Sequence, residues 1–188
     1  MTRCDWAKEP PETLYHDAEW GVPTRAEQHV FEHLCLEAAQ CGLSWRLVLL
    51  RRESYRKAFH GFDIERVAAI EDEELEHILT SSGIIRNRAK AKAVRNNARV
   101  LLGSRSQVPC LGSWMWKFVG DVPQVNRWNR MSEVPAFTET SIAMSKELKR
   151  LGFSFVGPTT IYAHMQACGM VNDHLVSCFR HSEVSSHG

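Results

Sequence analysis

Long apolar runs are missing from this 188-residue chain. None approaches the roughly 18 apolar residues that a membrane span requires, and the first six residues lack the apolar core of a secretory signal. The six cysteines form no paired framework, so we expect reduced thiols or metal ligands instead of disulfides. These absences favour a cytoplasmic protein without a membrane partner.

The net charge is small, and the sequence patterns of β-strands are rare. The formal charge of +1 makes no global case for a nucleic-acid partner, so any such case must rest on local patches. Alternation of apolar and polar residues, the mark of a half-buried strand, is nearly absent. The length favours one domain, which we place at residues 1–180, followed by a flexible polar tail at 181–188.

The sequence does contain helical periodicity. Apolar residues recur at spacings of three and four through most of the chain, with breaks at prolines and glycines. We therefore expect an all-α fold, with a short final helix that carries His174 and Cys178. The other helices are expected at residues 27–40, 46–59, 64–70, 73–79, 86–102, 111–119, 141–151 and 159–168.

Cysteine and histidine occur together near both ends of the chain. Cys4 and His16 form one half-site, and His174 and Cys178 form another. Two thiolates and two imidazoles are the donors of a tetrahedral zinc site. The alternative is that the four residues are unrelated, because the chain has six cysteines and nine histidines. Spacing alone leaves the two interpretations balanced.

Glu37 lies beside the apolar stripe of its expected helix. A carboxylate there must be paired, solvated by a pocket or functional, and a salt bridge to an arginine is the commonest outcome. Trp45 follows Glu37 closely in the sequence. Trp6, Tyr15 and Trp20 lie in the N-terminal segment that also carries Cys4 and His16. A carboxylate beside aromatic faces suits a flat cationic heterocycle such as an alkylated purine, although most aromatic clusters are simply core.

Glycine bounds a short turn between two expected helices. The turn runs from Gly152 to Gly157, and the next helix begins near Thr159. Glycine lets backbone N–H groups approach a phosphate, and a helix N-terminus favours an anion, as in a helix-hairpin-helix element on DNA. An ordinary corner between helices is commoner. The basic run at 86–99 is the clearest cationic patch, and a solvated helix face is its simplest explanation.

Several longer motifs follow one another along the chain. They are Arg3-Cys4-x-Trp6, Tyr15-His16-Asp17-x-Glu19-Trp20-Gly21-Val22-Pro23, Cys35-Leu36-Glu37-x-x-Gln40-x-Gly42-Leu43-Ser44-Trp45, Gly83-Ile84-Ile85-Arg86-Asn87-Arg88-x-Lys90, Leu151-Gly152-Phe153-x-Phe155-Val156-Gly157 and Met165-Gln166-Ala167-Cys168-Gly169-x-Val171-Asn172-Asp173-His174. In this order they resemble the type I 3-methyladenine DNA glycosylases of the helix-hairpin-helix superfamily. The resemblance covers about residues 3 to 178.

The resemblance implies a base-excision repair enzyme with a helix-hairpin-helix helical bundle. Such an enzyme flips 3-methyladenine out of double-stranded alkylated DNA and hydrolyses its N-glycosidic bond, which releases free 3-methyladenine and leaves an abasic site. A monomer is expected. One structural zinc ion, Zn2+, would join the two ends of the chain. Its ligands would be Cys4, His16, His174 and Cys178.

The resemblance also implies the residues of the active site. Glu37 would be the catalytic carboxylate in contact with the base, with Trp45 and Tyr15 stacking on the ring. Trp20 and Trp6 would complete the pocket.

A further set of residues is expected to contact DNA. Gly42 and Leu43 would fill the gap that the flipped nucleotide leaves, and Gly152, Gly157 and Thr159 would contact the backbone.

Three positions bear on the chemistry. Asn172 stands where most helix-hairpin-helix glycosylases carry a catalytic aspartate; the type I family shares this amide, which leaves Glu37 as the active-site carboxylate. Glu12 stands where the family often has a tyrosine, three residues before Tyr15, so one pocket wall differs. The hairpin lacks the lysine that bifunctional enzymes use as a nucleophile, so strand cleavage is not expected.

Three other interpretations stay open at this point. A zinc-stapled helical protein that binds damaged DNA without catalysis would need the hairpin and the basic run but not Glu37. A glycosylase for another N3-alkylated purine would make Glu12 the cause of the shift. A helical protein that serves only protein contacts would leave Glu37 beside Trp45 unexplained.

Overall fold

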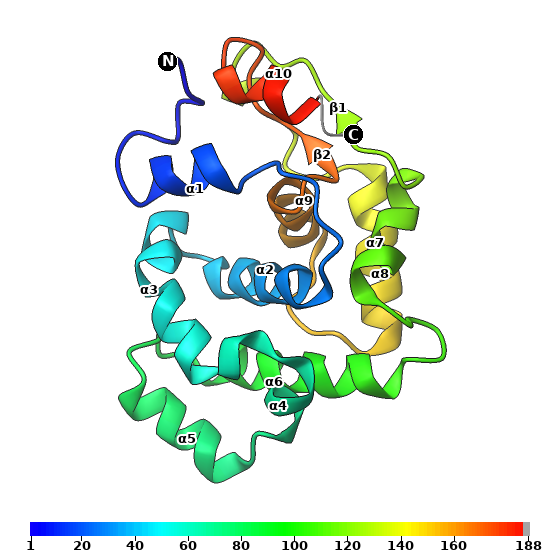
Figure 1. Ribbon diagram of the computed structural model, residues 1–188. Coiled ribbons are helices and arrows are strands. Elements are labelled where there is room, and N and C mark those ends of the chain that lie inside the picture. The colour runs from blue at the N-terminus through cyan, green and yellow to red at the C-terminus, as the bar shows by residue number, and fades with distance from the viewer. Residues whose placement is uncertain (186–188) are drawn as a thin grey trace.

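Helices account for nearly all regular structure in the computed structural model, which describes residues 1–185 (Figure 1). The α-helices are α1 (Glu12–Ala18), α2 (Glu27–Gln40), α3 (Trp45–Ala58), α4 (Ile64–Ala69), α5 (Asp72–Ser81), α6 (Arg88–Gly103), α7 (Leu111–Trp116), α8 (Glu139–Leu151), α9 (Pro158–Ala167) and α10 (Phe179–Ser185). The predicted helical fold class is confirmed. Among the described helices, none is both long and apolar enough for a membrane span.

The remaining regular elements are short. Three 3-10 segments lie at His60–Phe62, Lys117–Val119 and Met131–Glu133. Two parallel strands, β1 (Gln124–Val125) and β2 (Val171–Asn172), pair Gln124 with Val171 and Val125 with Asn172.

Helix α2 runs through the middle of the molecule (Figure 1). It packs against α3, α6, α7 and α9, and every residue from Val30 to Ala39 is buried. Neighbouring elements therefore cover this stretch on all sides, which is the position of a core helix. Because the helix also carries Glu32, His33 and Glu37, its polar side chains must find partners inside the protein or remain unpaired there.

Helices α8 and α9 enclose the predicted hairpin. Helix α8 ends at Leu151, and the next residue, Gly152, caps it with a left-handed φ of 105°. Helix α9 begins with Pro158. Asn97 of α6 fixes the connection: its side-chain amide donates to the Ser154 carbonyl at 3.1 Å and accepts from the Ser154 N–H at 2.8 Å. The hairpin is thus held by a buried side chain of another helix.

The prediction that a final helix carries His174 and Cys178 is wrong. Both residues lie in the irregular segment between β2 and α10, and α10 begins only at Phe179. The peptide N–H of His174 bonds to the side chain of Asn172 at 3.2 Å, and this local contact replaces helical pairing.

The predicted polar tail at 181–188 begins within the last helix. Residues 181–185 belong to α10, and residues 186–188 lie outside the described part of the chain. The side-chain amide of Asn172 donates to the His181 carbonyl and to the Ser185 hydroxyl, each at 3.0 Å. Val184 is buried, so α10 is packed onto the protein.

Gly169 marks a close approach between two distant segments. The residue has a φ of 68°, and a Cβ atom there would lie 2.4 Å from the backbone nitrogen of Pro23. Backbone bonds join the same segments nearby, from Thr24 N–H to the Cys168 carbonyl at 3.2 Å. A side chain at position 169 would force these backbones apart.

We expect Gly169→Ala to lower the free energy of unfolding by about 3 kcal/mol or more, because it adds both a backbone clash and an unfavourable φ. Gly120→Ala is the matched control: Gly120 has a φ of 69°, but a Cβ there meets nothing within 4 Å. The control should lose only about 1 kcal/mol. Urea denaturation measures both, and equal losses would contradict the close approach.

Candidate active site and metal centre

A pocket of about 280 Å³ lies between α1, α2, α3 and α9. It contains Glu37 and all four aromatic residues that the sequence analysis expected there. Its lining consists of Trp6, Glu12, Tyr15, Trp20, Glu37, Gln40, Trp45, Met131, Ala163 and Gln166. The expected residues therefore share one cavity, although they come from the N-terminal segment, from α2 and from α3.

The carboxylate of Glu37 is buried and alone. Its residue is 6% exposed, and among residues 1–185 the side chain has no hydrogen-bond or ion-pair partner. Burial raises its pKa from 4.5 to about 8. The alternative of a structural salt bridge to an arginine therefore fails for this residue.

Two neighbouring glutamates show the contrast. Arg52 binds Glu19 at 2.6 Å and Glu32 at 2.7 Å, and His33 also bonds to Glu19 at 2.6 Å. Burial alone would raise the pKa of Glu19, but the hydrogen bonds from His33 and Arg52 lower it below its ordinary value. The protein thus supplies partners to the acidic groups that serve its fold and withholds them from Glu37.

The pocket also presents unused hydrogen-bond donors. The hydroxyl of Tyr15 and the indole N–H of Trp45 are buried without a partner in the described structure. Their rings lie 5.3 Å apart, and the rings of Trp6 and Trp20 lie 5.1 Å apart. Buried polar groups without partners are rare in folded proteins, so two donors and one acceptor here indicate a site for a polar, flat ligand.

One wall of the pocket carries a second acidic residue. Glu12 lines the cavity and pairs with Arg46, whose nitrogen lies 3.6 Å from the glutamate oxygen. Arg46 also contacts Glu9 at 3.3 Å. At position 12, where the resembling family often has a tyrosine, this protein therefore has an ion pair instead of another aromatic ring.

Sequence reasoning missed four residues of the lining: Gln40, Met131, Ala163 and Gln166. Gln40 and Gln166 stand in motifs that the sequence analysis quoted without assigning them a role. Met131 had no signal, because it comes from a short 3-10 segment far from the other lining residues in the chain.

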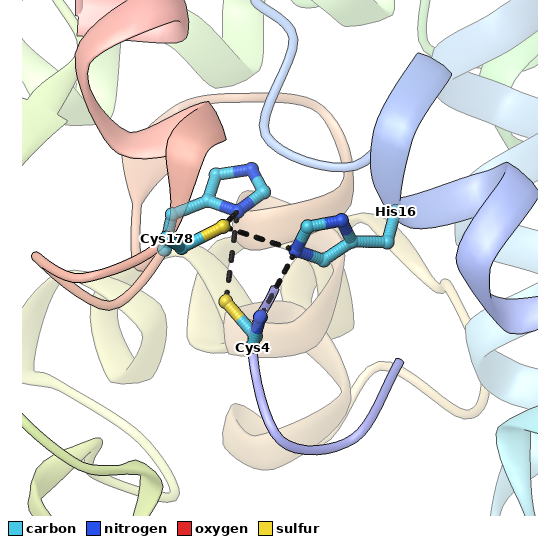
Figure 2. Close-up of side chains that lie close together, drawn as sticks. Cys4, His16 and Cys178 are labelled. Carbon is cyan, nitrogen blue, oxygen red and sulfur yellow. Dashed lines mark hydrogen bonds between the residues drawn. The ribbon is translucent and has the colours of Figure 1, made fainter. Parts of the chain in front are cut away.

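The two chain ends bring four metal-binding side chains together: Cys4, His16, His174 and Cys178. Figure 2 shows the side chains of Cys4, His16 and Cys178 turned toward one another. The four donor atoms all lie within 4.8 Å of one another, and all four residues are buried. The two half-sites are therefore one cluster that could hold a metal ion.

The spacing of the donors fits a tetrahedral ion. The Sγ of Cys178 lies 3.4 Å from the Nε2 of His16 and 3.6 Å from the Nδ1 of His174, which is also 3.6 Å from the Sγ of Cys4. A tetrahedron with Zn–S bonds of about 2.3 Å and Zn–N bonds of about 2.0 Å has S···N edges of about 3.5 Å. Four protein donors leave such an ion no open position.

The far nitrogen of each imidazole is fixed as well. Nδ1 of His16 lies 2.8 Å from the carboxylate of Asp17, which Arg3 clamps from the other side at 2.7 Å. Nε2 of His174 lies 3.0 Å from the carbonyl oxygen of Trp20. Acceptors on the outer nitrogen keep the inner nitrogen free of a proton, as metal-binding histidines require.

A second hollow of about 280 Å³ adjoins the aromatic pocket and shares Glu37, Gln40 and Ala163 with it. Its other lining residues are Cys41, Gly42, Leu43, Thr159 and Thr160. The turn after α2 and the start of α9 therefore face the same space. Leu43 is 38% exposed, so its side chain is available to a ligand. Gly152 is exposed and Gly157 is half-buried in the hairpin, and neither lines the hollow.

The basic run of α6 mainly serves the fold. Arg95 donates to the carbonyl of Ile70 and to the carboxylate of Asp72, at 3.3 and 2.7 Å. Arg99 donates to the carbonyls of Ala68 and Ile70, at 2.7 and 2.9 Å. These guanidinium groups hold backbone around α4 and so do not form a free cationic surface.

Asp173 is not available for chemistry. It is buried, and hydrogen bonds of 2.6 to 2.7 Å occupy both of its carboxylate oxygens. The donors are the side chains of Asn126, Trp128, Tyr162 and Gln166. Neither Asp173 nor the preceding Asn172 lines the aromatic pocket, so Glu37 and Glu12 are the carboxyl groups there.

The helical fold and a pocket that sets an unpaired carboxylate among aromatic rings are compatible with an enzyme that binds a flat, polar ring such as a nucleobase. The comparisons with known proteins agree. The profile of the methyladenine glycosylase family matches residues 6–181.

Individual relatives match over nearly the whole chain. The DNA-3-methyladenine glycosylase 1 of Escherichia coli (strain K12) is 46% identical over 179 residues, which are 95% of this chain and 96% of the relative. A crystal structure of a 3-methyladenine DNA glycosylase I superimposes with a TM-score of 0.91 at 45% identity, and covers 95% of this chain and 98% of its own. The enzyme of Staphylococcus aureus, solved to explain its recognition of 3-methyladenine, gives 0.91 at 30% identity, with 95% and 96% covered. The chain belongs to the methyladenine glycosylase family.

The isolation of Glu37 predicts how stability depends on pH. The ordinary pKa of 4.5 applies in the unfolded chain, and the pKa is about 8 in the folded protein. Between these values the folded state keeps a proton that the unfolded state has released, so stability falls as pH rises. We expect Glu37→Gln to remove this fall, so that its advantage over wild type grows by a few kcal/mol between about pH 5 and about pH 8.

Urea denaturation at a series of pH values tests this expectation. Glu53→Gln, which replaces an exposed glutamate on α3, is the control and should follow the wild-type profile. Parallel profiles for wild type and Glu37→Gln would show that Glu37 has a partner in solution.

Proposed function

We propose that the pocket around Glu37 is where this protein binds and excises 3-methyladenine. As a member of its family, the protein hydrolyses the N-glycosidic bond of this base in alkylated DNA, which yields the free base and an abasic site. The observation that carries the proposal for the pocket is a buried, unpaired carboxylate beside two unused donors and four aromatic rings.

The chemistry of the base fits these groups. Methylation at N3 gives adenine a positive charge, which favours the aromatic faces of Tyr15 and Trp45 and the ionised form of Glu37. The carboxylate accepts a hydrogen bond from the exocyclic amine or a ring N–H of the base. Because burial raises the pKa of Glu37 to about 8, a cationic base brings the charge that stabilises the carboxylate.

The same charge explains selection and catalysis. Normal adenine brings no positive charge and leaves the carboxylate uncompensated, so the pocket rejects it. The positive charge also weakens the bond between the base and the sugar, which leaves the enzyme a smaller barrier to lower than for a normal base. Glu37 lines both the aromatic pocket and the adjoining hollow. Its carboxylate therefore also stabilises the positive charge that develops on the sugar as the bond to the base breaks.

The DNA side of the reaction involves the turn after α2. Flipping a nucleotide costs a few kcal/mol, and less at a damaged base. Leu43 and Gly42 are proposed to fill the vacated space, which is supported by the exposure of Leu43 and by the hollow that leads from it to Glu37. Gly152, Gly157 and Thr159 are proposed to bind backbone phosphates through peptide N–H groups.

One further property follows from the same residues. Of the described residues, no lysine lines either hollow, so there is no amine nucleophile for strand cleavage. Double-stranded DNA as the substrate form, a monomeric state and a cytoplasmic location stay predictions from the sequence.

We propose zinc as the metal of the terminal cluster. Two cysteine sulfurs and two histidine nitrogens form the donor set of closed structural zinc sites, and the S···N spacings match a tetrahedron. When bound, the ion would crosslink the two ends of the chain and take no part in the reaction. The chemistry at the base is left to Glu37 and its neighbours.

A different N3-alkylated purine is the second candidate substrate. The observation in its favour is Glu12, which adds an ion pair with Arg46 to the pocket wall. A panel of alkylated bases in the excision assay decides between the two.

The excision assay measures bases released from methylated DNA and resolved by chromatography. We expect the wild-type chain to release 3-methyladenine but not 7-methylguanine. Glu37→Gln should slow release by about 100-fold or more while DNA affinity stays nearly unchanged, because the variant keeps the shape and loses the charge. Glu53→Gln should match wild type. No release from a folded, metal-loaded protein that still binds DNA would favour a non-catalytic reader of damage.

Elemental analysis and thermal unfolding test the metal. We expect one zinc ion per purified chain. Cys4→Ala should lose the ion and several kcal/mol of stability, because metal binding contributes directly to folding. Cys110→Ala, which removes a half-buried cysteine outside the cluster, is the control. A Cys4→Ala protein with no zinc and unchanged stability would reject a structural metal.

A further inference from the structure

Lys90 reaches from α6 to the end of α2. The side chain of Asn87 caps α6 by accepting from the N–H of Lys90 at 3.1 Å, and this contact places the lysine in the first turn of the helix. From there its ammonium donates to the carbonyls of Ala39 and Cys41, at 2.8 and 2.5 Å. One side chain thus crosslinks two helices that are adjacent at the core.

The contacted carbonyls belong to the last turn of α2 and the turn that follows it. Carbonyls at a helix C-terminus lack helical partners and carry partial negative charge, so an ammonium group there is a favourable partner. Two residues beyond Cys41 lies Leu43, whose own N–H bonds back to the Gln40 carbonyl at 2.6 Å. The ammonium therefore fixes the path of the chain just before the exposed leucine.

Little else restrains this turn. Gly42 has a φ of 78°, and a Cβ placed there would meet nothing within 4 Å. The Sγ of Cys41 makes long contacts, 3.5 Å from the hydroxyl of Thr160 and 3.8 Å from the Glu37 carbonyl. The two bonds from Lys90 are the charge-assisted contacts of the segment, and such bonds are stronger than neutral ones.

We propose that Lys90 is a positioning residue that holds the Gly42–Leu43 turn where Leu43 can fill the gap in the duplex. This inference rests on the proposed function of that turn. Lys90 lines neither hollow, so it acts through the turn and does not touch the base. Its loss should weaken the extruded state of the nucleotide and leave the base pocket intact.

A comparison of two affinities separates these effects. The probes are a duplex that contains a tetrahydrofuran abasic-site analogue and free 3-methyladenine. We expect Lys90→Met to weaken duplex binding by about tenfold, the scale of lost hydrogen bonds to a charged group, with little change for the free base. Lys90→Arg, which keeps the charge and the donors, should recover most of the duplex affinity.

Lys92→Met is the matched control, because Lys92 lies on the same helix and is exposed. It removes the same charge from the same helix without touching α2, and it should reproduce the wild-type values. Similar losses in Lys90→Met and Lys92→Met would show a general charge effect on DNA and would overturn the proposal.

A double-mutant cycle with Leu43→Ala tests the route of the effect. If Lys90 acts through the leucine, Lys90→Met should add little to the loss of duplex affinity that Leu43→Ala already causes. Additive losses, or an equal loss of 3-methyladenine affinity, would overturn the proposal. The duplex assay needs no turnover, so a failure of base release would reject the proposed function and still leave this cycle to decide on Lys90.

Discussion

The aromatic pocket depends on the contact between the two ends of the chain. Trp6 lies two residues after Cys4, Tyr15 directly precedes His16, and the carbonyl of Trp20 accepts from His174. Each aromatic residue of the N-terminal segment is therefore next to, or bonded to, a member of the terminal cluster. Burial in this short segment is modest, because α1 has only seven residues. The cluster thus joins this segment to the C-terminal part of the chain, whereas the long helix α2 forms the opposite wall.

Helix α2 forms the opposite wall of the pocket, and its neighbours explain why the Glu37 carboxylate has no partner within the described part of the chain. Arg52 and Arg56 of α3 face Glu32 and Glu19, whereas the last turn of α2 faces aromatic rings. An isolated carboxylate in such a place lowers stability at neutral pH, a penalty that proteins tolerate at functional sites. The paired acids nearby hold α2 and the N-terminal segment to α3, whereas the proposed partner of the unpaired Glu37 is a cationic ligand.

The sequence indicated much of this arrangement and missed what depends on distant partners. Periodicity located the long helices and set Glu37 beside an apolar stripe, and the family resemblance implied its aromatic neighbours. Helix α1, with two turns after Pro11, has too short a pattern to detect. His174 and Cys178 have helical spacing, yet β2 and the Asn172 side chain hold that segment out of a helix. Periodicity cannot see such tertiary contacts. The sequence also could not show whether Glu37 is paired. The packing of α3 against α2 decides which glutamates its arginines reach, and Arg52 and Arg56 reach Glu32 and Glu19 instead.

Helix α2 also joins the two halves of the proposed reaction. Glu37 lies in its last turn, and Leu43 follows six residues later, beyond a turn that Lys90 fixes to α6. The carboxylate proposed to contact the base and the side chain proposed to fill the duplex thus lie on the last turn of α2 and on the turn directly after it. In the proposed mechanism, a fully flipped nucleotide would place its base beside Glu37 while Leu43 fills the gap in the duplex. A partly extruded base would leave either the pocket or the gap unfilled.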